Sequence, residues 1–260
     1  MDRKRQAILL ALPASLALLV FFIIPMVYIL VKTISENGFA DFVNFFTDPF
    51  YLDILWTTVR VSLISTVVSL VLGYPTAYFM ARSKSRMKKV MIIIILFPFL
   101  VSAVVRSYGW MVLLGQKGIV NQFLLGIGLI SEPLKMLNTE FAVIVGMIHL
   151  LIPYMVLALL GVLQSIDPNV EYHLSTPGII SGCVLVFTMS MTSYVTPKLL
   201  GGSKFRMMAT MVVQEINVSF DWGAAAAISY ILLAVILLVQ LLVTLSTAKY
   251  MKRMGGGKNA

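Results

Sequence analysis

The chain of 260 residues contains too few charged residues for an ordinary soluble protein. Only 12% of its residues are charged, 59% are hydrophobic, and its mean hydropathy is +0.94, whereas about a quarter of a typical soluble domain is charged. The single cysteine, Cys183, excludes an intrachain disulfide framework and a cysteine-based metal cluster. We therefore expect a membrane protein with no room for a separate soluble domain.

Six apolar segments follow one another along the chain, and each is long enough to cross a membrane, for which about 20 residues suffice. The first could be a cleaved signal peptide, but it is longer than a typical signal core of about 7–15 residues and lacks a small-x-small cleavage site. The sequence therefore predicts an all-α, polytopic six-helix transmembrane bundle that forms one domain over residues 1–260. The expected spans are residues 7–31, 56–80, 90–114, 139–163, 175–197 and 223–248.

The segments between the expected spans differ in character. Residues 32–55 are predicted to form a mixed loop and residues 198–222 a polar loop. Residues 115–138 are predicted to form a loop whose apolar piece, residues 119–125, lies on the membrane surface. Spans one to five each contain proline, which kinks a helix. These kinks either belong to ordinary helix packing or act as hinges of a gate.

The positions of the basic residues indicate a membrane orientation rather than nucleic-acid binding, which the net charge of +9 could also suggest. If both termini are cytoplasmic, 12 of the 20 Lys and Arg residues fall in cytoplasmic segments and six in the opposite loops. The positive-inside rule then favours an even number of spans with both ends cytoplasmic. The 12 residues are Arg3, Lys4, Arg5, Arg82, Lys84, Arg86, Lys88, Lys89, Lys249, Lys252, Arg253 and Lys258.

Polar side chains within the expected spans are candidates for a translocation path, because such groups are costly at membrane depth. His149 lies about 15 Å into the fourth span at 1.5 Å per residue. It is either a neutral ring hydrogen-bonded to a neighbouring helix or a residue that lines the path. Arg106 either extends to the membrane surface or lines the path. The outer half of the fifth span is polar, either because it lines the path or because small polar residues pack helices together. The candidate path residues are Arg106, Tyr108, His149, Ser190, Ser193 and Tyr194.

No catalytic constellation is visible, so an enzyme is not expected, and the sequence gives no reason to expect a cofactor. The two histidines are far apart and have no carboxylate cluster beside them. The run Gly201 to Lys204 resembles a phosphate-binding loop only poorly. If ATP drives transport, another subunit must bind it.

Several stretches resemble the permease subunits of binding-protein-dependent ABC importers, and most closely their spermidine/putrescine-type branch. They are residues 73–78 (GYPTAY), 104–110 (VVRSYGW), 118–121 (GIVN), 161–168 (GVLQSIDP), 194–202 (YVTPKLLGG) and 221–225 (DWGAA). Each is weak alone, but their order and spacing cover nearly the whole chain. The resemblance implies a multi-pass protein of the cell inner (cytoplasmic) membrane. Its implied partners are a second permease subunit, ABC ATPase subunits, an extracytoplasmic binding protein and the lipid bilayer.

Residues 164–182 depart from the family pattern at the loop that should dock on the ATPase. Relatives carry about twenty more residues there, with the pattern E-A-A, three residues, then G. Here Glu171 matches the Glu, whereas Tyr172 and His173 replace the alanines. We expect at most one helical turn facing the ATPase. The candidate residues for this contact are Asp167, Asn169, Glu171 and His173.

The family resemblance implies passage of a small solute, with a polyamine as the first expectation. A path for a polycation is expected to contain carboxylates, yet no Asp or Glu lies well inside an expected span, and Arg106 has the opposite charge to a carboxylate. Thiamine, iron, sulfate and other small solutes stay open. Two other interpretations also stay open: a self-sufficient secondary transporter or channel, with His149 as coupling group, and a degenerate permease that cannot couple to its ATPase.

Overall fold

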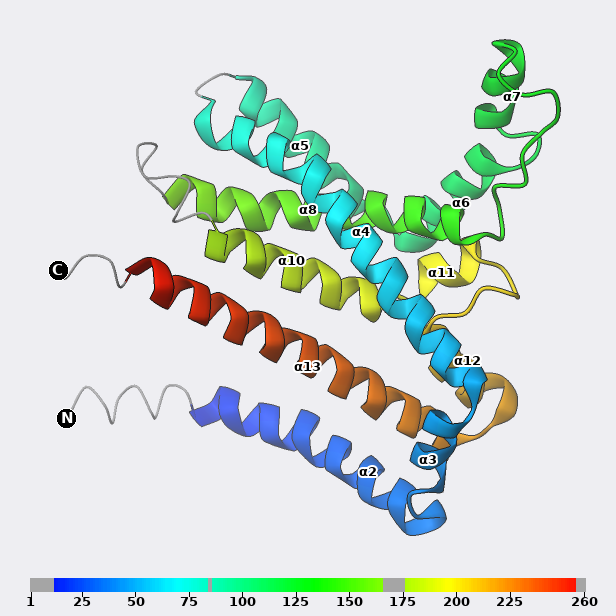
Figure 1. Cartoon of the computed structure of the whole chain (residues 1–260), viewed down its shortest axis with the longest axis vertical. Coiled ribbons are helices and arrows are strands. Elements are labelled where there is room, and N and C mark those ends of the chain that lie inside the picture. The colour runs from blue at the N-terminus through cyan, green and yellow to red at the C-terminus, as the bar shows by residue number, and fades with distance from the viewer. Residues whose placement is uncertain (1–11, 84–85, 166–175, 256–260) are drawn as a thin grey trace.

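The computed structural model describes residues 12–83, 86–165 and 176–255, and every element within them is a helix (Figure 1). This part of the chain confirms the all-α fold class. The elements are the π-helix η1 (Leu19–Ile23), α2 (Ile24–Asn37), α3 (Ala40–Thr47), α4 (Pro49–Arg82), α5 (Met87–Leu100), α6 (Ala103–Leu114), α7 (Ile119–Gly126), α8 (Glu140–Ser165), α10 (Thr176–Met191), α11 (Val195–Leu200), α12 (Met208–Gln214), the π-helix η3 (Glu215–Ser219) and α13 (Trp222–Gly255).

Four helices in the described residues are long and apolar enough to cross a membrane: Leu12–Ser35, Pro49–Arg82, Glu140–Gln164 and Trp222–Thr247. The bent pair α5 and α6–α7 raises this number to five when it is counted as one span. The apolar helix α10 has only 16 residues, or about 24 Å at 1.5 Å per residue, against a hydrocarbon core of about 30 Å. The count of six spans therefore stays a prediction.

The helix α8 lies at the centre of the bundle because one of its faces is a continuous apolar stripe. Every fourth residue from Val143 to Leu163 is almost completely buried, and residues four apart share a face of a helix. Facing α8, the helix α4 has a stripe of small residues that allows close approach. At Gly73 of that stripe, an added Cβ would lie 3.0 Å from Cγ of Met155. The stripe comprises Thr58, Ser62, Ser65, Ser69, Gly73 and Ala77.

A second apolar cluster joins α3, α4, α10, α12 and α13, and it corrects the expectation of a polar loop over residues 198–222. That segment contains the end of α11, all of α12 and η3, and its Met207, Met208 and Met211 are at most 2% exposed. The backbone N–H of Met208 donates to Oγ1 of Thr58 on α4 at 2.9 Å. The methionines pack the segment into the bundle although polar residues surround them in the sequence.

Residues 32–55 are also helical over most of their length, which corrects the expected mixed loop. They contain the end of α2, all of α3 and the first turns of α4. The helix α4 begins at Pro49, directly after Asp48, whose Oδ1 accepts the N–H of Phe50 at 2.9 Å. An Asp cap followed by Pro is a strong helix start, so this span starts earlier than the apolar run indicates.

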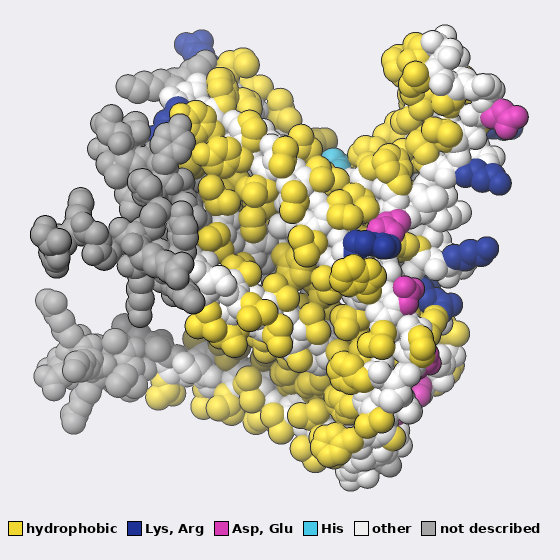
Figure 2. Space-filling view, in the orientation of Figure 1, with side chains coloured by type: hydrophobic (Ala, Val, Ile, Leu, Met, Phe, Trp, Pro, Cys, Tyr) yellow, Lys and Arg dark blue, Asp and Glu magenta, His cyan; other side chains and the backbone are white. Residues whose placement is uncertain are grey.

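The expected third span, residues 90–114, is two helices rather than one. The helix α5 ends at Leu100, and Ala103–Gly126 continues at an angle of 99°. Ser102 begins the second part, since its Oγ accepts the N–H of Val105 at 3.3 Å. The segment formed by α6 and α7 therefore projects from the bundle (Figure 1), and Figure 2 shows a hollow between this projection and the body.

The two ends of the bundle differ. The beginning of the first described helix, the end of α13 and the α4–α5 connection lie at one end, and α3, α7 and α12 lie at the other (Figure 1). In Figure 2 hydrophobic side chains cover most of the visible body, and charged side chains gather at the end that carries α3, α7 and α12. We refer to these as the terminal end and the opposite end.

Candidate functional site

A histidine and a tryptophan join α8 to α6 on the side of the projecting segment. Nε1 of Trp110 donates to Nδ1 of His149 at 3.2 Å. The two rings meet edge to face, with centroids 5.7 Å apart and planes at 70°. Both side chains are half-buried, so this contact lies at the wall of the bundle and not in its dry core.

Arg106 precedes Trp110 by one helical turn, which places the two side chains on the same face of α6. It is half-buried, and its Nε has no hydrogen-bond partner among the described residues. Arg60 of α4 forms an ion pair with Glu140 at the start of α8. Arg106 thus brings a positive charge close to His149 with no carboxylate paired to it.

The fifth expected span is interrupted beside these residues. The helix α10 ends at Met191, and α11 starts at Val195 after an unwound stretch. The hydroxyl of Ser190 is buried without a hydrogen-bond partner in the described structure, while Ser193 and Tyr194 are half-buried. Because α11 packs against both α6 and α8, the interruption lies on the same side of the bundle as α6. Interrupted helices with unwound backbone are a feature of solute sites in many transporters.

The structure does not bring all the expected path residues together. Arg106 and His149 lie close to each other, and the α10–α11 break carries Ser190, Ser193 and Tyr194. Tyr108 instead has 54% of its surface exposed and points away from the Trp110–His149 contact, since it is two residues from Trp110 on α6. The ATPase-facing candidates Asp167, Asn169, Glu171 and His173 lie outside the described residues.

Two features of this region were not assigned a role from the sequence. One is Trp110, and the other is an aromatic contact between Phe99, in the last turn of α5, and Tyr154 of α8, with ring centroids 4.7 Å apart. Together the two contacts attach both halves of the bent segment to α8. Both Trp110 and Arg106 belong to the VVRSYGW stretch. Their spacing of one helical turn could have indicated from the sequence that they share a face of α6.

The sequence also gave no role to Asn121, which holds together the projecting segment formed by α6 and α7. It is completely buried; its Nδ2 donates to the carbonyls of Gly115 and Leu134, both at 3.0 Å, and its Oδ1 accepts the N–H of Leu134 at 2.9 Å. These bonds close the loop around α7. The expected membrane-surface location of residues 119–125 stays a prediction, although Ile119 and Phe123 of α7 are exposed.

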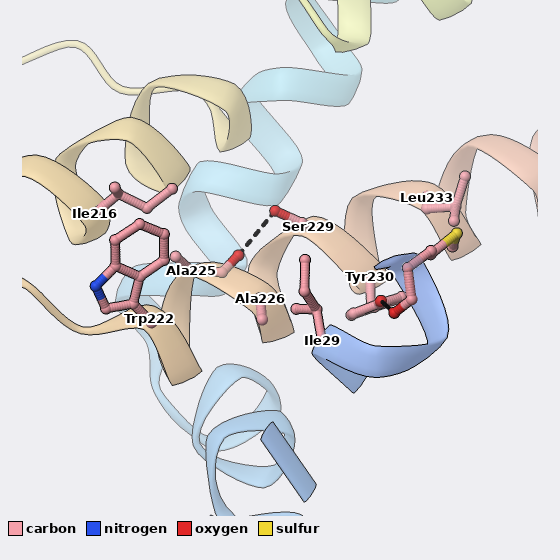
Figure 3. A pocket seen from close by; sticks show the side chains of 9 residues that line it. Ile29, Ile216, Trp222, Ala225, Ala226, Ser229, Tyr230 and Leu233 are labelled. Atoms are coloured by element: carbon pink, nitrogen blue, oxygen red, sulfur yellow. Dashed lines mark hydrogen bonds between the residues drawn. The ribbon is translucent and has the colours of Figure 1, made fainter. Parts of the chain in front are cut away.

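Other hollows of the bundle are apolar and offer little for recognising a polar solute. A groove of about 340 Å³ separates α2 from α13, and Figure 3 shows its lining. Two of its polar groups are bonded within the chain: Ser229 donates to the carbonyl of Ala225 at 2.8 Å, and Tyr230 donates to the carbonyl of Met26. A second groove of about 370 Å³ between α4, α10 and α13 is lined mainly by aliphatic side chains.

No group of three or more His, Cys, Asp or Glu side chains within the described ranges could hold a metal ion. The region between α6, α8 and the α10–α11 break gathers the polar side chains of Arg106, His149, Ser190, Ser193 and Tyr194.

Comparison with known proteins identifies the family. No family model matches the chain. The spermidine/putrescine transport system permease protein PotB of Haemophilus influenzae is 30% identical over 256 residues, which cover 88% of this chain and 89% of that protein. The PotB protein of Escherichia coli K12 is 33% identical over 215 residues, covering 75% and 78%. The chain belongs to the permease family of ABC importers. Family members are transport proteins, and this permease is accordingly a multi-pass membrane protein whose family implies ATPase and binding-protein partners.

Solved structures show that the permease shares the fold of its family. A bacterial ABC transporter that imports the acidic polysaccharide alginate matches with a TM-score of 0.72 and 18% identity, over 95% of this chain and 96% of that one. A second structure, with an alginate-bound periplasmic protein in the complex, matches with a TM-score of 0.73 at the same identity. A more distant curated relative is the molybdenum transport permease ModB of Mycobacterium bovis, 26% identical over 88% of the permease.

Proposed function

We propose that this permease forms part of the membrane path through which an ATP-driven importer passes a polyamine delivered by an extracytoplasmic binding protein. The observation that supports the cargo is the 30–33% identity to PotB proteins over at least three quarters of the chain. The proposed path is lined by Arg106, His149, Ser190, Ser193 and Tyr194, supplied by α6, α8 and the α10–α11 break.

The proposal includes six spans with both termini cytoplasmic and a second permease subunit. Support comes from the first and last described helices, whose outer ends lie at the same end of the bundle. The basic residues Arg82, Lys88 and Lys89 flank the α4–α5 connection at that end. A second subunit is needed because the hollow beside α6 is open in one chain (Figure 2), and the path requires a wall on that side.

One observation favours a second candidate cargo, an anionic solute. Arg106 has no ion pair in the described structure, and a guanidinium is well suited to bind carboxylates and oxyanions. A polycation would be repelled by this charge. The binding protein makes the first selection in such importers, so the charge of Arg106 weakens the polyamine proposal without replacing it.

Uptake by the reconstituted importer tests both candidates. The permease is placed in proteoliposomes with its partner permease and ATPase, and accumulation of radiolabelled spermidine or of an oxyanion is followed with binding protein and ATP. We expect spermidine uptake that stops without either the ATPase or the binding protein. Oxyanion uptake that is lost in Arg106→Gln would establish the second candidate. Uptake by the permease alone would instead establish a self-sufficient transporter.

A further inference from the structure

We propose that Trp110 is a positioning residue that keeps His149 as a neutral imidazole with its proton on Nε2, so that the path has the same charge at every pH between about 5 and 8. This inference rests on the proposed path, because it concerns the two residues that join α6 to α8 within it. The solute would then meet a hydrogen-bond donor at His149 and a fixed positive charge at Arg106.

The geometry of the contact determines the position of the proton. An indole N–H can donate a hydrogen bond but cannot accept one. The bond of 3.2 Å from Nε1 of Trp110 therefore ends on a lone pair of Nδ1 of His149. An imidazole with a free lone pair on Nδ1 carries its single proton on Nε2, and an imidazolium has no lone pair to offer. Protonation of His149 must break the bond to Trp110.

One charged residue lies beside this contact. Arg106 is one turn before Trp110 on the same face of α6 and is half-buried. Among the other titratable or charged groups on α8 and on the helices that pack against it, Arg60 is paired with Glu140. These groups are Tyr51, Asp53, Arg60, Tyr74, Tyr78 and Arg82 on α4, Lys88 and Lys89 on α5, Tyr108 on α6, Glu140 and Tyr154 on α8, Cys183 on α10 and Lys198 on α11.

The consequence is that His149 is a donor site and not a proton carrier. A free histidine changes charge near pH 6.5 and would make the path more positive in acid. With the indole bonded to Nδ1, the permease should work equally well at acidic and neutral pH. This also separates it from a proton-coupled transporter, in which an ionisable residue near mid-membrane must gain and lose a proton in each cycle.

Substitution of Trp110 by Phe tests the inference. Phe keeps an aromatic ring against the imidazole but removes the N–H. At pH 5.5 about nine tenths of unperturbed histidines are cationic. We expect the uptake rate of the reconstituted importer to be unchanged between pH 7.5 and 5.5 with the native chain, and to fall up to tenfold with Trp110→Phe. The double variant Trp110→Phe/His149→Gln should be pH-independent again, since Gln donates from a similar position and does not titrate. Trp56→Phe, at a position of α4 where the side chain is 60% exposed, is the control and should behave as the native chain.

A spectroscopic measurement tests the same inference without any transport. The chain has two histidines, so His173→Gln leaves His149 as the only one. The ¹⁵N NMR spectrum of the histidine-labelled protein in detergent then distinguishes an Nε2–H tautomer, an Nδ1–H tautomer and a cation. We expect the Nε2–H tautomer at both pH 7.5 and pH 5.5, and a cation at pH 5.5 in Trp110→Phe.

The outcomes separate the inference from the proposed function. An Nδ1–H tautomer or a cation at neutral pH in the native sequence overturns the inference, as does a pH profile that Trp110→Phe leaves unchanged in a working importer. If no solute is taken up under any condition, the proposed function fails, while the NMR spectrum still decides the state of His149.

Discussion

Thr58 links the interior of α4 to the beginning of α12 through one hydroxyl group. Its Oγ1 donates to the carbonyl of Ile54 at 2.7 Å and accepts the N–H of Met208 at 2.9 Å. Thr58 is completely buried, so no water can replace either bond. The hydroxyl therefore satisfies a backbone N–H that would otherwise be buried without a partner.

Replacing Thr58 with Val should destabilise the permease by about 1–3 kcal/mol, the cost of leaving a buried donor unsatisfied. The side chain keeps its shape and loses only the hydroxyl. Thermal unfolding in detergent, followed by circular dichroism, measures the effect. Thr58→Ser retains the hydroxyl and is the matched control, which should remain closer to the native stability. Equal stability of the Val variant and the native chain would show that the Met208 N–H needs no acceptor.

At the scale of elements, the contact between α8 and α10 depends on the absence of a side chain at Gly178. A Cβ at this position would lie 2.2 Å from Cγ1 and 2.6 Å from Cβ of Val162. A branched side chain cannot move its own Cβ away without moving the backbone. The first turn of α10 can thus lie against α8 only with glycine at this position.

Gly178→Ala should therefore destabilise the permease by about 1–3 kcal/mol, as is usual for overpacking, and should separate α10 from α8. Gly161→Ala is the matched control, because an added Cβ on this α8 residue meets no atom within 4 Å. Alanine is there a better helix former than glycine, so this variant should be as stable as the native chain or more so. Comparable melting temperatures for the two variants would contradict the packing argument.

The sequence could predict which segments cross the membrane better than where each helix begins, ends or bends. Residues 90–114 are apolar overall, so their composition gave no sign of the turn at Val101 and Ser102. Only local signals, Pro98 and a serine able to cap a helix, mark that position. Residues 198–222 were expected to be a loop because polar residues separate their methionines, and only the tertiary packing of α12 against α4 and α13 buries Met208 and Met211.

The sequence could indicate single residues of the candidate path, but it could not predict which of them contact one another. His149 and Arg106 were noticeable because polar groups are rare in apolar runs. Their relation depends on the angle at which α6 leaves α5 and on Trp110, which alone carries no functional signal. The residues of the ATPase-facing loop, 166–175, lie outside the described structure, so that part of the prediction is not tested by it.

For the whole molecule, we predict that residues at the opposite end are accessible from outside the cell. Ser203 is exposed in the connection between α11 and α12, and Ser83 follows α4 at the terminal end. In a Cys183→Ala background, an impermeant thiol reagent added to intact cells should label Ser203→Cys and not Ser83→Cys. Both should react after permeabilisation, which is the control. Labelling of Ser83→Cys in intact cells would reverse the orientation.

We also predict that this chain binds its ATPase weakly. A docking helix of two to three turns takes roughly seven to eleven residues at 3.6 per turn, and the stretch between α8 and α10 must also leave one helix and enter the next. Copurification with the ATPase and substrate-stimulated ATP hydrolysis should both be low. Insertion of a full coupling segment between Glu171 and Leu174 should raise both, whereas an inserted Gly-Ser stretch of equal length should not. Normal coupling by the native chain would mean that the contact is made elsewhere, for example by residues 82–89.

The methionines of the core give the interior an unusual mechanical character. Met80, Met147, Met155 and Met191 are completely buried, as are Met207, which precedes α12, and Met208, the first residue of α12. An unbranched thioether chain changes its rotamers easily and fills irregular gaps, whereas β-branched side chains hold one shape. Helices in contact through methionine can slide by an ångström or two and still exclude voids. A permease that opens alternately to the two sides of a membrane needs such a deformable interior, because its helices must exchange neighbours without leaving the packed state.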